Sequence, residues 1–231
     1  MTYSRARWSS SSRWAAAGLL VCAVGAGRAA PPGRGSVAGL VSVRAGGGPR
    51  ADRSSVVVYL EKVPGPAPDG SARGAQIRQR NQTFVPDLAV VQKGEKVEFP
   101  NEDKVFHNVF SVSRVARFDL GLYKSGTSKS VTLPEPGVVD VYCNIHPQMV
   151  AKIKVLDSGY YAITAPDGRF RIDNVPEGTY PIVAWQAYGD EYRGQVTVSA
   201  GGTTQVAIDL SAGEVVRRHL RKDGTPYGRY K

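Results

Sequence analysis

Val141-Tyr-Cys-Asn-Ile-His-Pro-Gln-Met149 is the stretch around which the rest of the chain is interpreted. It places a thiol, an imidazole and a thioether three residues apart, at Cys143, His146 and Met149. These are soft and borderline ligands of the kind that copper prefers. A second histidine, His107, lies 36 residues before Cys143 in a strand-like run. The four side chains together make a candidate copper site.

Alternating apolar and polar residues predict strands on both sides of this stretch. In the run 138–143, Cys143 ends a row of valines on one face, and the run 149–155 alternates in the same way. In the run 104–111, period two places His107 on the same face as two valines. We therefore expect Cys143 and His107 to point inward, with the candidate ligands on a tight turn beside a neighbouring strand.

Two further predictions concern the packing of the same block. Residues 88–92 and 96–99 are apolar runs on either side of Lys93-Gly94, and this spacing is typical of a β-hairpin. Large aromatic residues are more often core than electron relays. We assign that core role to four of them: Phe106, Phe110, Tyr142 and Trp185.

The composition favours an all-β fold without nucleic-acid binding. The 231 residues include 26 Gly and 15 Pro, and short strand-like runs dominate. The formal net charge is +10, but four arginines lie in residues 1–30 and six Lys or Arg lie in the last 21 residues. The body between these ends is close to neutral, so no basic stripe for phosphates is expected.

Residues 1–30 have the pattern of an export signal peptide. Arginines come first, then the apolar run 14–26, then small residues that end at Ala30. The apolar run is too short to cross a bilayer, so we expect no integral membrane segment after cleavage. Cys22 would be removed with the signal, because Val21 fits a lipoprotein cleavage site poorly. The alternative is a disordered basic N-terminus. With export, Cys143 would be the one thiol of a periplasmic or secreted protein, either buried or bound.

The central block, residues 76–157, is flanked by segments of different character. Residues 158–210 consist of short alternating runs joined by Asp-Gly and Gly-Gly turns, which is typical of a small β-sandwich. Residues 31–75 hold two apolar runs, at 36–43 and 56–60, and a Pro- and Gly-rich linker.

The last segment, residues 211–231, is a basic tail without a core-forming pattern. We interpret it as a solvated end that includes His219. The alternative is a patch that docks to an acidic redox partner or an anionic surface.

Two motifs of the central block carry a family resemblance. Lys104-Val-Phe-His-Asn-Val-Phe and Pro136-Gly-Val-Val-Asp-Val-Tyr-Cys-Asn-Ile-His-Pro-Gln-Met149 resemble the cupredoxins, the type 1 copper proteins with a Greek-key β-sandwich. The short loop with Pro147 after its histidine is most similar to amicyanin. Plastocyanin and pseudoazurin have a longer His-to-Met spacing, so the likeness to them holds at the level of the fold.

The resemblance implies roles for individual residues. His107, Cys143 and His146 would be equatorial ligands of one copper ion that alternates between Cu(I) and Cu(II), and Met149 would be the axial ligand. Asn108 matches the residue that braces the ligand loop by hydrogen bonding. His146 would be the partly exposed edge through which the electron leaves.

A second resemblance covers the C-terminal block. The pattern Thr164-x3-Gly-x-Phe-x-Ile-x2-Val-Pro-x-Gly-x-Tyr180 is similar to the carboxypeptidase regulatory-like, or transthyretin-like, β-sandwich. Exported bacterial proteins labelled methylamine-utilisation-like pair the two modules, with the cupredoxin inserted into the sandwich. In that arrangement residues 36–62 belong with 158–210. The other possibility is that residues 56–60 supply the first strand of the cupredoxin.

The sequence therefore predicts an exported mononuclear copper protein that passes single electrons between redox partner proteins. Alternatives are a periplasmic copper carrier that binds and delivers Cu(I), and a surface interaction module without functional metal. An enzyme is not expected, since four protein ligands leave copper no open position for a substrate.

Overall fold

The structure of the chain is a computed structural model that describes residues 33–65, 74–213 and 219–227. The expected signal peptide and residues 66–73 of the linker lie outside the described residues. The described residues form strands and turns and contain no helix, so the all-β prediction is confirmed. In the same part of the chain, no helix has the length and apolar character that crossing a membrane requires.

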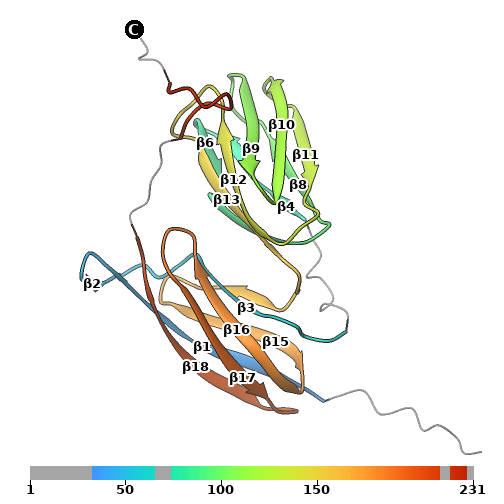
Figure 1. The fold of residues 1–231 in the computed structure, drawn as a ribbon, viewed down its shortest axis with the longest axis vertical. Helices are drawn as coiled ribbons and strands as arrows, with labels where there is room; N and C mark the ends of the chain where they lie inside the picture. Colours follow the sequence, from blue (N-terminus) through green and yellow to red (C-terminus); the bar gives the residue numbers. More distant parts are fainter. Residues whose placement is uncertain (1–32, 66–73, 214–218, 228–231) are drawn as a thin grey trace, which may run out of the picture. The chain divides into compact units, whose positions relative to one another are not determined.

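The central domain, residues 74–156, is a two-layered β-sandwich (Figure 1). Its larger sheet has the order β10 (Ala116–Tyr123), β9 (His107–Ser113), β12 (Gly137–Cys143), β13 (Val150–Leu156) and β7 (Leu88–Gln92). The smaller sheet has the order β11 (Ser128–Thr132), β8 (Lys96–Pro100) and β4 (Ala75–Gln76). A short ribbon of β5 (Arg78–Arg80) and β6 (Thr83–Val85) accompanies them. The core lies between the layers, where Phe99 of β8 and Val141 of β12 belong to one buried cluster.

The expected strand phase of the central domain is correct at its middle strands. Val139, Val141 and Cys143 are fully buried, as the alternation of β12 predicts. His107 and Val109 are fully buried as well. β9 begins only at His107, so Val105, which is expected on the same face as His107, is 41% exposed. The core role assigned to Phe106 is wrong for the same reason, since this residue is 53% exposed.

The expected hairpin of residues 88–92 and 96–99 is also wrong. β7 pairs in parallel with β13, whereas β8 pairs with β11 and β4 in the other sheet. The turn at Gly94 thus carries the chain from one layer to the other. Four consecutive buried residues, 88–91, explain the difference, because a strand covered on both faces is a continuous apolar run and lies within a sheet rather than in a half-exposed hairpin.

A second β-sandwich, here called the split sandwich, is built from strands on both sides of the central domain in sequence. One sheet has the order β15 (Arg169–Pro176), β1 (Arg34–Ala45) and β18 (Thr203–Ser211), with β2 (Gly48–Pro49) beside β1. The other has the order β14 (Tyr161–Ile163), β3 (Val56–Leu60), β16 (Gly178–Gln186) and β17 (Glu191–Val198). Because β3 pairs with β14 and β16, residues 56–60 are not the first strand of the central domain.

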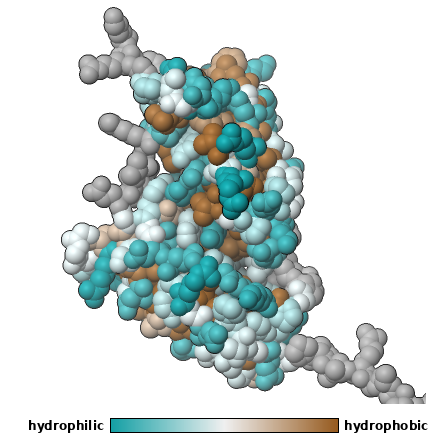
Figure 2. Space-filling model, in the orientation of Figure 1, coloured by the Kyte–Doolittle hydropathy of each residue, from teal (hydrophilic) through white to brown (hydrophobic). Residues whose placement is uncertain are grey.

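The strand β3 is buried along its whole length, with both faces covered. Val56, Val58 and Leu60 belong to the core of the split sandwich. Val57 and Tyr59 belong to a further cluster that also contains Leu88 and Val90 of β7 and Trp185 of β16. On the face drawn in Figure 2, hydrophobic residues form small patches among hydrophilic ones, as expected for a surface in contact with water.

Candidate metal centre

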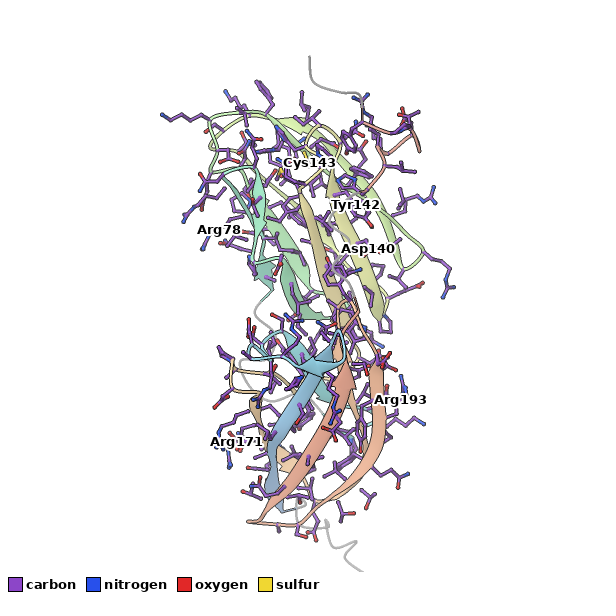
Figure 3. The ribbon with its side chains drawn as sticks, turned by 90° about the vertical axis from the view of Figure 1, so that its left-hand side faces the viewer. Arg78, Asp140, Tyr142, Cys143, Arg171 and Arg193 are labelled. Atoms are coloured by element: carbon purple, nitrogen blue, oxygen red, sulfur yellow. The ribbon has the colours of Figure 1, made fainter. Side chains whose placement is uncertain are left out.

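The candidate ligands lie where three strands of the larger sheet end or begin. Cys143 ends β12, and the loop 144–149 leads directly into β13. Figure 3 shows Cys143 at the loop end of this strand, with Tyr142 and Asp140 following along it. The loop is closed by its own backbone, since the Cys143 N–H donates to the Met149 carbonyl (3.3 Å) and the Met149 N–H donates to the His146 carbonyl (3.1 Å).

His107 enters the site from the start of β9. The pairing of Cys143 with Val109 brings this strand alongside β12, two residues from His107. The His107 Nε2 lies 2.8 Å from Asp103 Oδ2, and Asp103 also accepts backbone N–H groups from Asn81 (2.6 Å) and Gln82 (2.8 Å). With the proton on Nε2 toward this carboxylate, Nδ1 is left as the ring nitrogen available for a metal.

The pKa of Asp103 agrees with its role as the hydrogen-bond acceptor of His107 Nε2. Burial by itself raises the pKa of the carboxyl group, but the hydrogen bonds from Gln82, His107 and Asn81 outweigh it and hold the pKa below the ordinary value of 3.8. Asp103 is therefore ionised near neutral pH, and it can orient the imidazole through a charge-assisted hydrogen bond.

Three donor atoms from these segments converge on one point. The Cys143 Sγ lies 3.9 Å from His107 Nδ1 and 3.6 Å from His146 Nδ1, and the two Nδ1 atoms are 3.1 Å apart. The three donors all lie within 4.8 Å of one another. Both imidazoles and the sulfur thus present lone pairs to a shared space, in which a cation is the natural occupant.

The spacing of the donors fits a small transition metal. A metal about 2.0 Å from each nitrogen and about 2.3 Å from sulfur, with near-trigonal angles, places nitrogen about 3.5 Å from nitrogen and about 3.7 Å from sulfur. The observed S···N separations agree with this arrangement, and the N···N separation is a few tenths of an ångström shorter. One thiolate and two imidazoles in a trigonal set are the donors that type 1 copper uses.

The protonation states of the other two ligands follow from their surroundings. Burial raises the pKa of the Cys143 thiol above the ordinary 9.0, and backbone amides of Asn108, Ile145 and His146 oppose this shift. Burial also lowers the pKa of His146, with a further decrease from His107 and an opposing effect of Asp103. Without metal at neutral pH, the site therefore holds a neutral thiol and a neutral His146, so metal binding must displace the thiol proton.

Met149 lies where the sequence predicts it, whereas the side chain of Asn108 does not make the predicted hydrogen bond to the ligand loop. Met149 is fully buried at the end of the loop. The Asn108 side chain does not brace the loop: its Nδ2 donates to Asp119 Oδ1 (2.6 Å) on β10, and its Oδ1 is buried without a hydrogen-bond partner in the described part of the chain. The backbone amide of Asn108, rather than its side chain, acts on Cys143.

The basic tail contributes contacts that the sequence interpretation missed. The His219 ring is stacked on Tyr142 at a centroid distance of 4.4 Å, and the Tyr227 hydroxyl donates to the Cys143 carbonyl (2.5 Å). The interpretation of the tail as a solvated end is therefore wrong for His219 and Tyr227, which are partly buried, whereas residues 220–226 are exposed as expected. Aromatic residues among the basic ones of the tail were the available signal, but their distance from Cys143 along the sequence concealed it.

Comparison with known families agrees with this geometry. Residues 74–156 match the model of copper binding proteins of the plastocyanin/azurin family. This part of the chain is a plastocyanin/azurin family domain. Its family and its His-Cys-His cluster both point to copper as the metal.

Residues 138–211 match the model of the carboxypeptidase regulatory-like domain, which overlaps the plastocyanin/azurin domain over residues 138–156. Strand pairing assigns residues 138–156 to the central domain, because β12 and β13 lie in the sheet that carries the candidate ligands. The regulatory-like domain therefore consists of the strands from β14 onward, completed by β1 and β3.

Solved cupredoxins are similar to parts of the chain. A novel purple cupredoxin from Nitrosopumilus maritimus is 25% identical, with 35% of this chain and 98% of that chain covered and a TM-score of 0.33. A reduced mutant of amicyanin is 25% identical, with 42% and 97% covered and a TM-score of 0.34. The copper-containing nitrite reductase of Thermus scotoductus SA-01 is 24% identical, with 36% and 22% covered and a TM-score of 0.34. No curated protein sequence gives a significant match.

Proposed function

We propose that the chain is an exported type 1 copper protein that passes single electrons between redox partner proteins. The observation that carries this proposal is the convergence of Cys143 Sγ with the Nδ1 atoms of His107 and His146 inside a plastocyanin/azurin domain. These three would be the equatorial ligands of one copper ion, and Met149 would supply a weak axial thioether. Bound copper supplies a one-electron couple between Cu(I) and Cu(II).

The chain's own residues would hold the donors still in both oxidation states. Asp103 fixes the tautomer and the orientation of His107. The two backbone hydrogen bonds of the loop 143–149 limit the motion of Cys143 and His146. Little rearrangement of the ligands is what fast electron transfer requires, so this rigidity supports the electron-transfer function.

Burial of the ligands favours an electron carrier over a copper carrier. His107, Cys143 and Met149 are fully buried, and only His146 is partly exposed. A metal-delivery protein must hand its ion to an acceptor through exposed ligands, whereas an electron can leave through the edge of one imidazole. His146 would be that edge, and the partners would be proteins that dock around it. Four protein ligands would leave no position for a substrate, which argues against enzymatic turnover.

Voltammetry and metal transfer together test this proposal. The mature protein, loaded with one equivalent of copper, should give a reversible one-electron wave and should retain its copper when mixed with an apo-acceptor. Rapid loss of copper to the acceptor without a reversible wave would contradict the proposal and favour copper delivery. Export is tested separately by N-terminal sequencing of the protein from its native host, where a start near residue 31 is expected.

A further inference from the structure

The C-terminal segment of residues 219–227, here called the C-terminal clasp, lies against the loop of the metal centre. Figure 1 shows it in red beside the ends of β9 and β12, far along the sequence from both. The segment has its own turn, in which the Arg221 N–H donates to the Thr225 carbonyl and the Gly224 N–H to the Arg221 carbonyl, both at 2.9 Å. It is thus an ordered element with local hydrogen bonds.

The clasp contacts three consecutive residues at the start of the ligand loop. His219 stacks on Tyr142, with an interplanar angle of 21°. The Tyr227 hydroxyl donates to the carbonyl of Cys143 (2.5 Å). The Lys222 backbone N–H donates to the side-chain oxygen of Asn144 (2.9 Å). The ligand Cys143 is therefore held on both sides and at its own carbonyl group.

The clasp also reaches β10, which pairs with the strand that carries His107. The Lys222 Nζ lies 2.5 Å from Asp119 Oδ2, and the other oxygen of Asp119 accepts the Asn108 side-chain amide (2.6 Å). Asn108 directly follows His107. The ion pair is exposed at the surface and contributes little by itself, but it gives the clasp a second anchor next to the metal centre.

The aromatic rings of the clasp are packed together at this point. His219 lies edge-on to Tyr227 with ring centroids 5.3 Å apart, and Phe110 of β9 lies 6.1 Å from the same imidazole. Tyr142 and Phe110 are themselves 5.7 Å apart. Four rings from three separate segments thus form one cluster, which lets the clasp resist motion of the loop through packing as well as hydrogen bonding.

From these contacts we infer that the C-terminal clasp is a positioning element for the copper site, with Tyr227 and His219 as its positioning residues. They act on the backbone and on the neighbours of Cys143, and so restrict where its sulfur can lie. This inference rests on the proposed function for its consequence on copper, but the restriction of the loop exists in the metal-free protein as well.

Hydrogen exchange of the metal-free, full-length protein tests the restriction without copper. Tyr227→Phe keeps the ring and removes the hydroxyl that donates to the Cys143 carbonyl and lies 3.4 Å from His219 Nδ1. In this variant the amides of Cys143 and Met149 should exchange about fivefold faster. His219→Leu should have an effect of similar size. The control Tyr192→Phe, on β17 of the split sandwich, should leave both amides unchanged. Unchanged exchange in both clasp variants would overturn the inference.

Spectroscopy of the copper-loaded proteins tests the consequence for the site. Tyr227→Phe should shift the reduction potential and the intensity ratio of the two thiolate-to-copper absorption bands, whereas Tyr192→Phe should not. A faster-exchanging loop with an unchanged spectrum and potential would overturn the positioning role. If the wild-type protein forms no type 1 site while the clasp variants still speed exchange, the proposed function fails and the restriction of the loop stands.

Discussion

Replacing Asp103 by alanine removes the group that orients His107. The carboxylate accepts three hydrogen bonds, from the His107 imidazole and the backbone amides of Asn81 and Gln82, at 2.6 to 2.8 Å. Its side chain is only 12% exposed, so water replaces these bonds poorly. Hydrogen bonds to a charged group are worth about 1.5–3 kcal/mol each and are not additive, so we expect the metal-free variant to lose about 3 kcal/mol of unfolding free energy.

The same substitution should weaken copper binding by about 10–100-fold, the usual effect of removing the partner of a metal-bound histidine. Competition for Cu(I) with a coloured chelator at pH 7 measures the affinity, and urea unfolding measures the stability. Asp103→Asn should lose less, because its remaining carbonyl oxygen can still accept from His107 while its amide faces Asn81. Asp157→Ala, which removes an exposed ion pair with Lys93, is the control. An affinity of Asp103→Ala within twofold of the wild-type value would refute the orienting role.

Three further predictions concern ligation, pH and the split sandwich. Met149→Leu keeps the buried volume, so the metal-free stability should change by less than about 1.5 kcal/mol, while voltammetry should show a shifted potential if the thioether is the axial ligand. Copper affinity should rise about tenfold per pH unit from pH 6 to 8, because the raised pKa of Cys143 keeps the thiol protonated and copper must displace that proton; a flat chelator-competition profile would contradict this. Because the pKa of Cys143 is higher in the folded than in the unfolded protein, its contribution to metal-free stability is present below pH 9.0. This contribution decreases as the pH rises through the folded-state pKa. Val58→Ala, at a fully buried position of β3, should cost about 2 kcal/mol in urea unfolding and leave the copper spectrum unchanged.

The features that follow from local periodicity could be predicted from the sequence. Alternation along β12 places Cys143 in the core. His107 is buried as expected, although the first five residues of β9 are all buried and alternation is not visible there. The spacing of Cys143, His146 and Met149 requires a single tight loop, and the structure has that loop. These predictions succeed because the period of a strand and the length of a turn are set by neighbouring residues.

The features that depend on distant partners could not be predicted in this way. Residues 88–91 and β3 are apolar throughout, and only the sheets packed on both faces decide which strands they pair with. The partner of Asn108 is Asp119, which lies across a bulge in the pairing of β10 with β9. His219 and Tyr227 follow the last strand of the split sandwich in sequence, far from Tyr142 and Cys143, which they contact in the structure. The basic residues around them are typical of a solvated tail.

One visible absorption spectrum decides whether the protein holds a type 1 copper site. The mature protein loaded with one equivalent of Cu(II) should show an intense thiolate-to-copper charge-transfer band, because Cys143 Sγ lies 3.6 and 3.9 Å from the two imidazole nitrogens that would complete a type 1 site. The band should be absent from Cys143→Ser loaded in the same way. A colourless wild-type product, or an intense band that persists in Cys143→Ser, would contradict a type 1 copper site with Cys143 as its thiolate ligand.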